Sequence, residues 1–146
     1  MVTVVKKTAE IPAAPEKIIT IMLDVADHPT WQKEVQKIEV LEFDDQGRPL
    51  LTRVHVSAMG QVASYTMRYT YLDENRFESH LVEGDVMTRN DFTFAATAAE
   101  GGGSHVELSQ EIDLRWPLPG FMIDQLAMKG VKDMLKALTA KAVIAN

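Results

Sequence analysis

The residues of this sequence that could bind or act on a substrate are amides and hydroxyls set between apolar residues. Side chains alternate between the two faces of a β-strand, so residues two apart share a face. The polar residues that share a face with large apolar ones are Ser79 with Phe77 and Leu81, Asn90 with Phe92 and Phe94, and Gln110 with Leu108 and Ile112. A buried polar group without a partner is costly. These three residues are therefore expected either to orient a ligand carbonyl or hydroxyl, or to satisfy one another or hold water.

Three tyrosines form a second candidate row. Tyr65, Tyr69 and Tyr71 fall on one face of the predicted strand 61–72, together with Met67. Each phenol hydroxyl could donate a proton to a substrate. A tyrosine row on a strand is also typical of packing with the hydroxyls at the edge, so both interpretations stay open.

The motifs give no support to other chemistries. The four histidines, His28, His55, His80 and His105, form no dense metal-ligand pattern. His105 and Glu107 share a strand face, but that face is expected to meet water. The glycine run after residue 100 lacks the Lys-Ser/Thr of a phosphate loop, and no G-x-S-x-G serine elbow occurs. The absence of cysteine excludes disulfides, thiolate metal sites and cysteine nucleophiles. We therefore expect no metal and no cofactor.

Length and charge narrow the class of protein. The 146 residues fit one domain, residues 1–146, with enough chain to bury a core. The net charge of -6 argues against a nucleic-acid partner, which usually meets a basic face. No apolar run approaches the roughly 18 residues of a membrane span, and the N-terminus lacks the order of a signal peptide. The sequence predicts a cytoplasmic protein without stable membrane insertion, and it leaves the oligomeric state open.

Periodicity and turn residues indicate the elements that must position these side chains. Period-two stretches separated by Gly, Asp and Asn predict seven strands, at 3–11, 35–43, 49–57, 61–72, 76–83, 86–96 and 105–116. Pro15 favours the first turn of a helix. Asp27 can cap a short second helix, in which Trp31 either anchors the segment or guards an opening.

The last stretch of the chain predicts one long helix, 121–144, entered through Pro117-Leu118-Pro119-Gly120. Apolar residues recur in it at steps of three and four, the spacing of one helical face. The predicted apolar face consists of Ile123, Ala127, Val131, Met134, Leu138 and Ala142, widened by Leu126 and Leu135. Such a helix needs a large apolar surface to lie on.

Consecutive hairpins with segregated helices predict an α+β fold, with a curved antiparallel seven-stranded sheet wrapped around the C-terminal helix. The element order is β-α-α-β-β-β-β-β-β-α. Space between sheet and helix would be concave and mostly apolar, the usual character of a ligand site. The residues expected to line it are Trp31, Tyr65, Met67, Tyr69, Phe77, Ser79, Leu81, Asn90, Phe92, Phe94, Leu108, Gln110, Ile112, Met122, Leu126, Val131 and Met134.

Two stretches resemble a known family. Ile11-Pro12-Ala13-Ala14-Pro15-Glu16 matches an I-x-A-x-P-E opening, and the stretch from Asp24 to Trp31 matches D-x-x-x-x-P-x-W. Both resemble the START-like superfamily, also called SRPBCC or the polyketide cyclase/dehydrase and lipid-transport family. The turn from Asp44 to Arg48 and the Pro-x-Pro-Gly-Phe entry to the last helix resemble its small actinobacterial members. Ile21 departs from it, because members often carry Trp or Phe nearby. The resemblance implies a helix-grip fold with a hydrophobic cavity, and members that bind lipids, sterols, polyketides, quinones or hormones.

The sequence leaves three functional hypotheses open. The leading hypothesis is a carrier or sequestering protein for a hydrophobic small molecule such as a lipid or polyketide. The second is a polyketide cyclase or aromatase that holds a reactive chain in the same cavity, where proximity supplies much of the rate. The third is a protein-interaction or stress-response module. No pair of tuned acid and base residues is evident, so whether the protein is an enzyme stays open and its catalytic residues are unknown.

Overall fold

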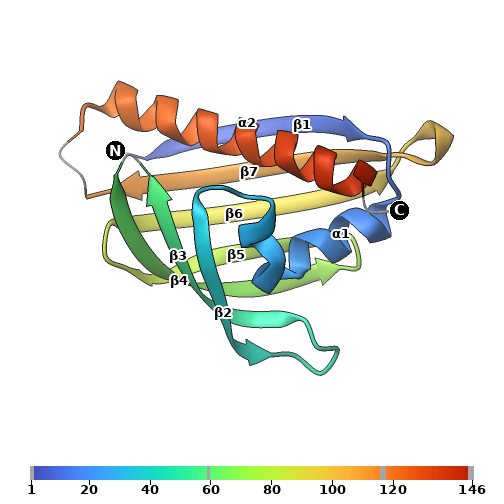
Figure 1. Ribbon diagram of the computed structural model, residues 1–146, viewed down its shortest axis with the longest axis horizontal. Coiled ribbons are helices and arrows are strands. Elements are labelled where there is room, and N and C mark those ends of the chain that lie inside the picture. The colour runs from blue at the N-terminus through green and yellow to red at the C-terminus, as the bar shows by residue number, and fades with distance from the viewer. Residues whose placement is uncertain (1, 59, 116–117, 145–146) are drawn as a thin grey trace.

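A computed structural model describes residues 2–58, 60–115 and 118–144 of the chain. The described residues form seven strands, two α-helices and two short 3-10 helices (Figure 1). The elements in chain order are β1 (Thr3–Ile11), α1 (Pro15–Leu23), a 3-10 helix (Val25–Thr30), β2 (Val35–Phe43), β3 (Pro49–Ala58), β4 (Gln61–Asp73), β5 (Arg76–Gly84), β6 (Met87–Ala98), a 3-10 turn (Glu100–Gly102), β7 (Ser104–Leu114) and α2 (Gly120–Ile144).

The strands form one antiparallel sheet of seven strands in the order β1-β7-β6-β5-β4-β3-β2. From β2 to β7 each strand pairs with the next along the chain, as the hairpin signals predict. β1 returns to pair with β7, so β1 and β2 are the two edge strands. The predicted α+β class, the strand number and the element order are confirmed.

Helix α2 lies along β1 and β7 on the inner face of the sheet, defined here as the face that carries α1 and α2 (Figure 1). At its start, the Thr3 hydroxyl donates a hydrogen bond of 2.6 Å to Asp124. Near its end, the Lys141 ammonium lies 3.4 Å from the Asp27 carboxylate. No helix in the described part of the chain combines the length and apolar character needed to cross a membrane.

The buried stripe of α2 differs from the predicted one at one position. Its buried residues are Ile123, Ala127, Val131, Leu135, Leu138 and Ala142. Leu135 thus takes the buried place that the sequence pattern assigned to Met134. Met134 is half-buried and packs against the rim of the core, because the helical turn places it on the flank that faces the middle of the sheet.

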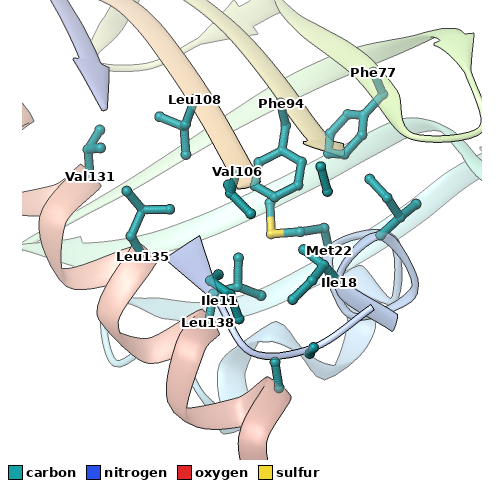
Figure 2. Close-up of a cluster of buried hydrophobic side chains, with 14 of the residues drawn as sticks. Ile11, Ile18, Met22, Phe77, Phe94, Val106, Leu108, Val131, Leu135 and Leu138 are labelled. Carbon is teal, nitrogen blue, oxygen red and sulfur yellow. The ribbon is translucent and has the colours of Figure 1, made fainter. Parts of the chain in front are cut away.

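The core lies where α1 and the second half of α2 meet the sheet (Figure 2). Ile18 and Met22 of α1 point toward the rings of Phe77 and Phe94, and Leu138 of α2 approaches from the other side. Leu138 and Ile18 are 0% exposed. Side chains of α1, α2 and the strands β1, β5, β6 and β7 close this end of the inner face.

Some predicted boundaries are wrong by a few residues. The short helix begins at Val25 and not after Asp27, because the backbone N–H of Asp27 already bonds to the carbonyl of Asp24 at 3.1 Å. The sixth strand begins at Met87 and the last one ends at Leu114. Trp116 and Pro117, which the sequence placed at the end of that strand and the approach to α2, lie outside the described residues.

Candidate functional site

Most of the predicted site residues line up as cross-strand neighbours on the inner face. Strand register places Tyr69 opposite Ser79, Ser79 opposite Phe92, and Phe92 opposite Gln110. This set is called the middle row. Directly opposed side chains in a sheet stand about 4.5–5.5 Å apart at their Cβ atoms, so the four form a continuous line across four strands.

The row on the α1 side of the middle row is packed core. Its residues are Tyr71, Phe77, Phe94 and Leu108. Phe77 stacks on Phe94 with ring centroids 5.5 Å apart, within the range of favourable aromatic pairs. Phe77, Phe94 and Leu108 are all buried against side chains of the helices. These three predicted ligand contacts therefore lie beneath other protein side chains.

The middle row itself is less covered. Phe92, Tyr69 and Gln110 are half-buried, whereas Ser79 between them is buried. The ring of Phe92 lies 6.2 Å from that of Phe77, so the aromatic cluster continues from the core into this row. The middle row combines partly accessible aromatic surface with three polar groups.

The third row pairs Met67 with Leu81 and Asn90 with Ile112. Leu81 is half-buried and the other three are buried. The Asn90 side chain accepts a hydrogen bond of 3.1 Å from the Gln110 amide and directs its own amide toward the Met87 sulfur at 3.6 Å. Two of the three polar residues found from the sequence therefore satisfy each other.

Burial governs the chemistry of the tyrosines. Desolvation raises the pKa of Tyr65 to about 12 and raises that of Tyr69 further. Both phenols are protonated at neutral pH, so each can donate a hydrogen bond but is a poor base. The pKa of Tyr71 is also raised by burial, and its hydroxyl is already used, donating to the Pro49 carbonyl at 2.5 Å. The Arg48 guanidinium lies 4.0 Å above the Tyr71 ring.

Thr52 of β3 is a polar residue of this face that sequence reasoning missed. It is fully buried opposite Met67, and its hydroxyl has no hydrogen-bond partner of standard geometry within the described chain. The Thr52 hydroxyl opposes the rise in the pKa of Tyr69 that burial causes. The signal was available: Thr52 alternates with the apolar residues Leu50 and Val54.

Three residues of α2 border the middle of the sheet. Met122, Leu126 and Met134 are half-buried, whereas the fourth predicted helix residue, Val131, is buried in the core. The helical turn places Leu126 and Met134 on one flank, which faces the inner sheet away from β1. Apolar side chains of α2 thus lie along the middle of the inner face.

Trp31 closes the 3-10 helix and is half-buried against the core cluster. Its ring meets His28 edge-on with centroids 5.0 Å apart. The indole N–H is enclosed and finds no acceptor among the described residues. An enclosed donor of this kind is costly, which makes it a candidate for bonding to a bound molecule.

All four histidines lie within the described residues, and none faces the middle row. His28 is buried, with Nε2 donating to the Met22 carbonyl at 2.9 Å, and burial lowers its pKa. The outer face of the sheet holds the other three, which bond to carboxylates: His55 to Glu39, His80 to Asp91 and Glu78, and His105 to Glu10 and Glu107. In residues 2–58, 60–115 and 118–144, no group of three or more His, Asp or Glu side chains is placed to hold a metal ion.

A hollow of about 190 Å³ opens at the α1 end of the sheet. It reaches Phe77 and Tyr71 between Leu23 of α1 and the charged pairs Arg48–Asp44 and Arg76–Asp73. Ligand pockets usually measure roughly 300–1,000 Å³, so this hollow is too small to hold a drug-sized molecule by itself. It gives water access to the rim of the aromatic cluster.

Comparison with known proteins gives a family and several structural relatives. Residues 2–143 match the model of the family described as polyketide cyclase/dehydrase and lipid transport. No curated protein matches the sequence significantly. A START superfamily protein from Mycobacterium smegmatis superposes with a TM-score of 0.91 at 26% identity, covering 98% of this chain and 99% of that chain.

Two further solved structures extend the likeness. A protein from Thermus thermophilus gives a TM-score of 0.85 at 26% identity, with 98% and 99% of the two chains covered. An aromatase/cyclase from a Streptomyces species gives 0.82 at 16% identity, with 97% and 94% covered. At that identity the last likeness concerns the fold alone.

Proposed function

Because the chain belongs to the polyketide cyclase/dehydrase and lipid transport family, a START-like family with a hydrophobic-ligand-binding fold, we propose that it binds a hydrophobic small molecule on its inner face as a carrier or sequestering protein. The ligand class is a lipid, a polyketide or a molecule of similar character. It would lie along the middle row, between the sheet and the flank of α2 that carries Leu126 and Met134.

One observation carries the proposal: large apolar side chains of the inner face stay half-buried although a core closes beside them. Phe92, Leu81 and Met134 come from two strands and the long helix, and each keeps part of its surface accessible. Removing such surface from water is favourable by about 25 cal/mol per Å². A ligand that covers these side chains gains this energy without unfolding any element.

The polar groups of the face favour a ligand with few polar atoms. The Tyr69 hydroxyl can donate to a ligand oxygen, because its raised pKa keeps it protonated. The Thr52 hydroxyl and the Trp31 indole N–H supply further groups without partners. An apolar ligand with one or two hydroxyl or carbonyl oxygens would suit this set.

Two adjacent residues of β5 provide a test. Leu81→Trp places an indole on the inner face, whereas Val82→Trp places the same side chain on the outer face, where Val82 is 55% exposed. Binding of oleic acid and of the fluorescent probe anilinonaphthalene sulfonate would be measured by native mass spectrometry and by titration. We expect Leu81→Trp to weaken binding about tenfold or more and Val82→Trp to leave it unchanged. Equal binding by both variants would contradict an inner-face site.

A polyketide cyclase is the second candidate, supported by the donors of the middle row. Tyr69 and Ser79 stand opposite each other, where they could hold a folded polyketone by its carbonyl oxygens. Among the residues of the middle and third rows, however, neither a carboxylate nor a histidine is present to accept a proton. Turnover of a polyketone that falls at least tenfold in Tyr69→Phe, with ligand binding retained, would favour the enzyme over the carrier.

A further inference from the structure

A second hollow lies on the other flank of α2, away from the middle row. It measures about 690 Å³ and is formed by the edge of β1 and the outer side of the helix. Its lining consists of Lys7, Thr8, Ala9, Met128, Lys129, Lys132, Asp133, Leu135, Lys136 and Thr139. We call it the β1 groove. It shares no residue with the proposed ligand site, so it requires an explanation of its own.

The charge of the β1 groove is opposite to that of the chain. Four lysines and one aspartate give its lining a net charge of +3, whereas the whole chain carries -6. Asp133 pairs with Lys129 at 2.5 Å, which leaves the positive charge concentrated on Lys7, Lys132 and Lys136. A basic groove on an acidic protein favours an acidic occupant and disfavours a cationic one.

The strand that borders the groove has a free edge. β1 pairs with β7 over all nine residues without a bulge, and no strand of the described residues lies on its other side. The backbone N–H and C=O groups on that side can accept another strand. β2, the other edge strand, is interrupted by three register shifts and has the 3-10 helix packed against it. β1 is therefore the more regular edge for strand addition.

The position of Lys7 connects the edge to the charge. Lys7 alternates with Val5 and Ala9, which places its side chain on the face that α2 covers. It is nevertheless exposed, because it lies in the opening between the strand edge and the helix. Its ammonium thus faces the same space as Lys132 and Lys136. Met128 and Leu135 add apolar surface to that space.

We propose that the β1 groove binds an extended acidic segment of a partner protein, which adds to β1 as an eighth strand and directs carboxylates toward Lys7, Lys132 and Lys136. The helix residues of the lining, 128–139, span roughly 17 Å at 1.5 Å per residue. An extended segment of about five residues covers that length. Pairing between the β1 edges of two copies is disfavoured, because each copy would bring the same lysines.

The test is titration of the full chain with short labelled peptides, followed by fluorescence anisotropy. An alternating Glu–Val peptide should bind, and its affinity should fall with added salt, whereas a Lys–Val peptide should not bind. Lys132→Glu should weaken binding by about fivefold or more. The matched control Lys37→Glu, the same charge reversal on β2, should leave binding unchanged. Hydrogen exchange should show new protection of the β1 amides when the acidic peptide is bound.

Three outcomes would overturn the proposal. The first is equal binding of the peptide by wild type and Lys132→Glu, provided thermal melting shows that both are folded. The second is binding without added protection in β1, which would mean a diffuse anion site and no added strand. The third is binding of phosphatidylserine vesicles but not of the peptide, which would assign the groove to an anionic membrane surface. None of these results bears on the inner-face ligand, so the two proposals fail separately.

Discussion

Two regions of the same inner face differ in how completely they are covered. At the α1 end, Phe77 and Phe94 are buried beneath α1 and the second half of α2. In the middle row, which is the next row along the same strands, Phe92 and Tyr69 are half-buried. Both regions are aromatic and both are formed by β4, β5 and β6, so composition does not separate them. The two regions differ in how far α1 and α2 cover them.

This difference indicates where stability and binding reside. A side chain enclosed on all sides contributes its full transfer energy to folding, and its removal leaves a cavity. A half-buried side chain contributes less to folding and keeps surface for another molecule. We therefore expect substitutions in the two regions to separate effects on unfolding from effects on binding. Two predictions test that separation, and a third concerns the dependence of stability on pH.

The largest effect should come from a charge placed in the closed region. Leu138→Lys buries an unpaired ammonium at a position with 0% exposure and should cost about 4 kcal/mol or more, a large part of the stability of a domain this size. Met134→Lys, on the half-buried flank of the same helix, should cost much less because its ammonium can reach water. Urea unfolding followed by circular dichroism measures both. Similar losses in the two variants would refute the assignment of the helix faces.

A smaller effect should separate two neighbouring phenylalanines. Phe94→Ala should lower the free energy of unfolding by about 3–5 kcal/mol, as for a fully enclosed ring. Phe92→Ala should lower the free energy of unfolding by only about 1–2 kcal/mol, because that ring is half-buried. The same substitution should weaken binding of the apolar ligand. The same urea titration, combined with ligand titration, measures the two quantities. A stability loss at Phe92 as large as that at Phe94 would show that the middle row is closed core.

The smallest effect concerns pH and two histidines. Burial lowers the pKa of His28, so the folded state binds its proton less readily than the unfolded state, and stability should fall as pH drops below about 6.5. The hydrogen bond that His80 donates to the Asp91 carboxylate raises the pKa of His80, so its contribution to stability is present below about pH 6.5 and is lost as pH rises through the raised value. The melting temperature of His28→Gln should vary less than that of wild type between pH 7 and about pH 5. His80→Gln should lose at least as much stability on acidification as wild type, because it lacks the stabilisation that protonated His80 supplies at low pH.

The elements themselves could be predicted with few errors, because each is signalled locally. The alternation of Tyr65, Met67 and Tyr69 predicts β4, and the spacing of Ile123, Ala127 and Val131 predicts α2. The sequence pattern placed Met134 in the buried stripe of α2, where the structure buries Leu135, so the predicted stripe is wrong by one residue at this point. Both residues are large and apolar and stand next to each other, so the pattern alone could not decide between them.

The candidate site was less predictable. Residues such as Ser79, Asn90 and Gln110 were found because polar groups in apolar rows are unusual. Their partners were not found: the bond between Gln110 and Asn90 joins residues 20 apart in the chain. Thr52 was missed although it alternates with apolar residues in the same way. The β1 groove could not be predicted from the sequence either, because it brings Lys7 near lysines that are more than a hundred residues away in the chain.

The sequence by itself determined the order of strands and helices, the apolar character of one sheet face and the exclusion of cysteine chemistry. These properties follow from local spacing and residue type, which the chain carries wherever it folds. Only the tertiary structure decided which part of the inner face is closed and which stays accessible, and that β1 and α2 enclose a basic groove. Those properties depend on where α1 and α2 come to rest on the sheet, and contacts between distant segments have no local signal.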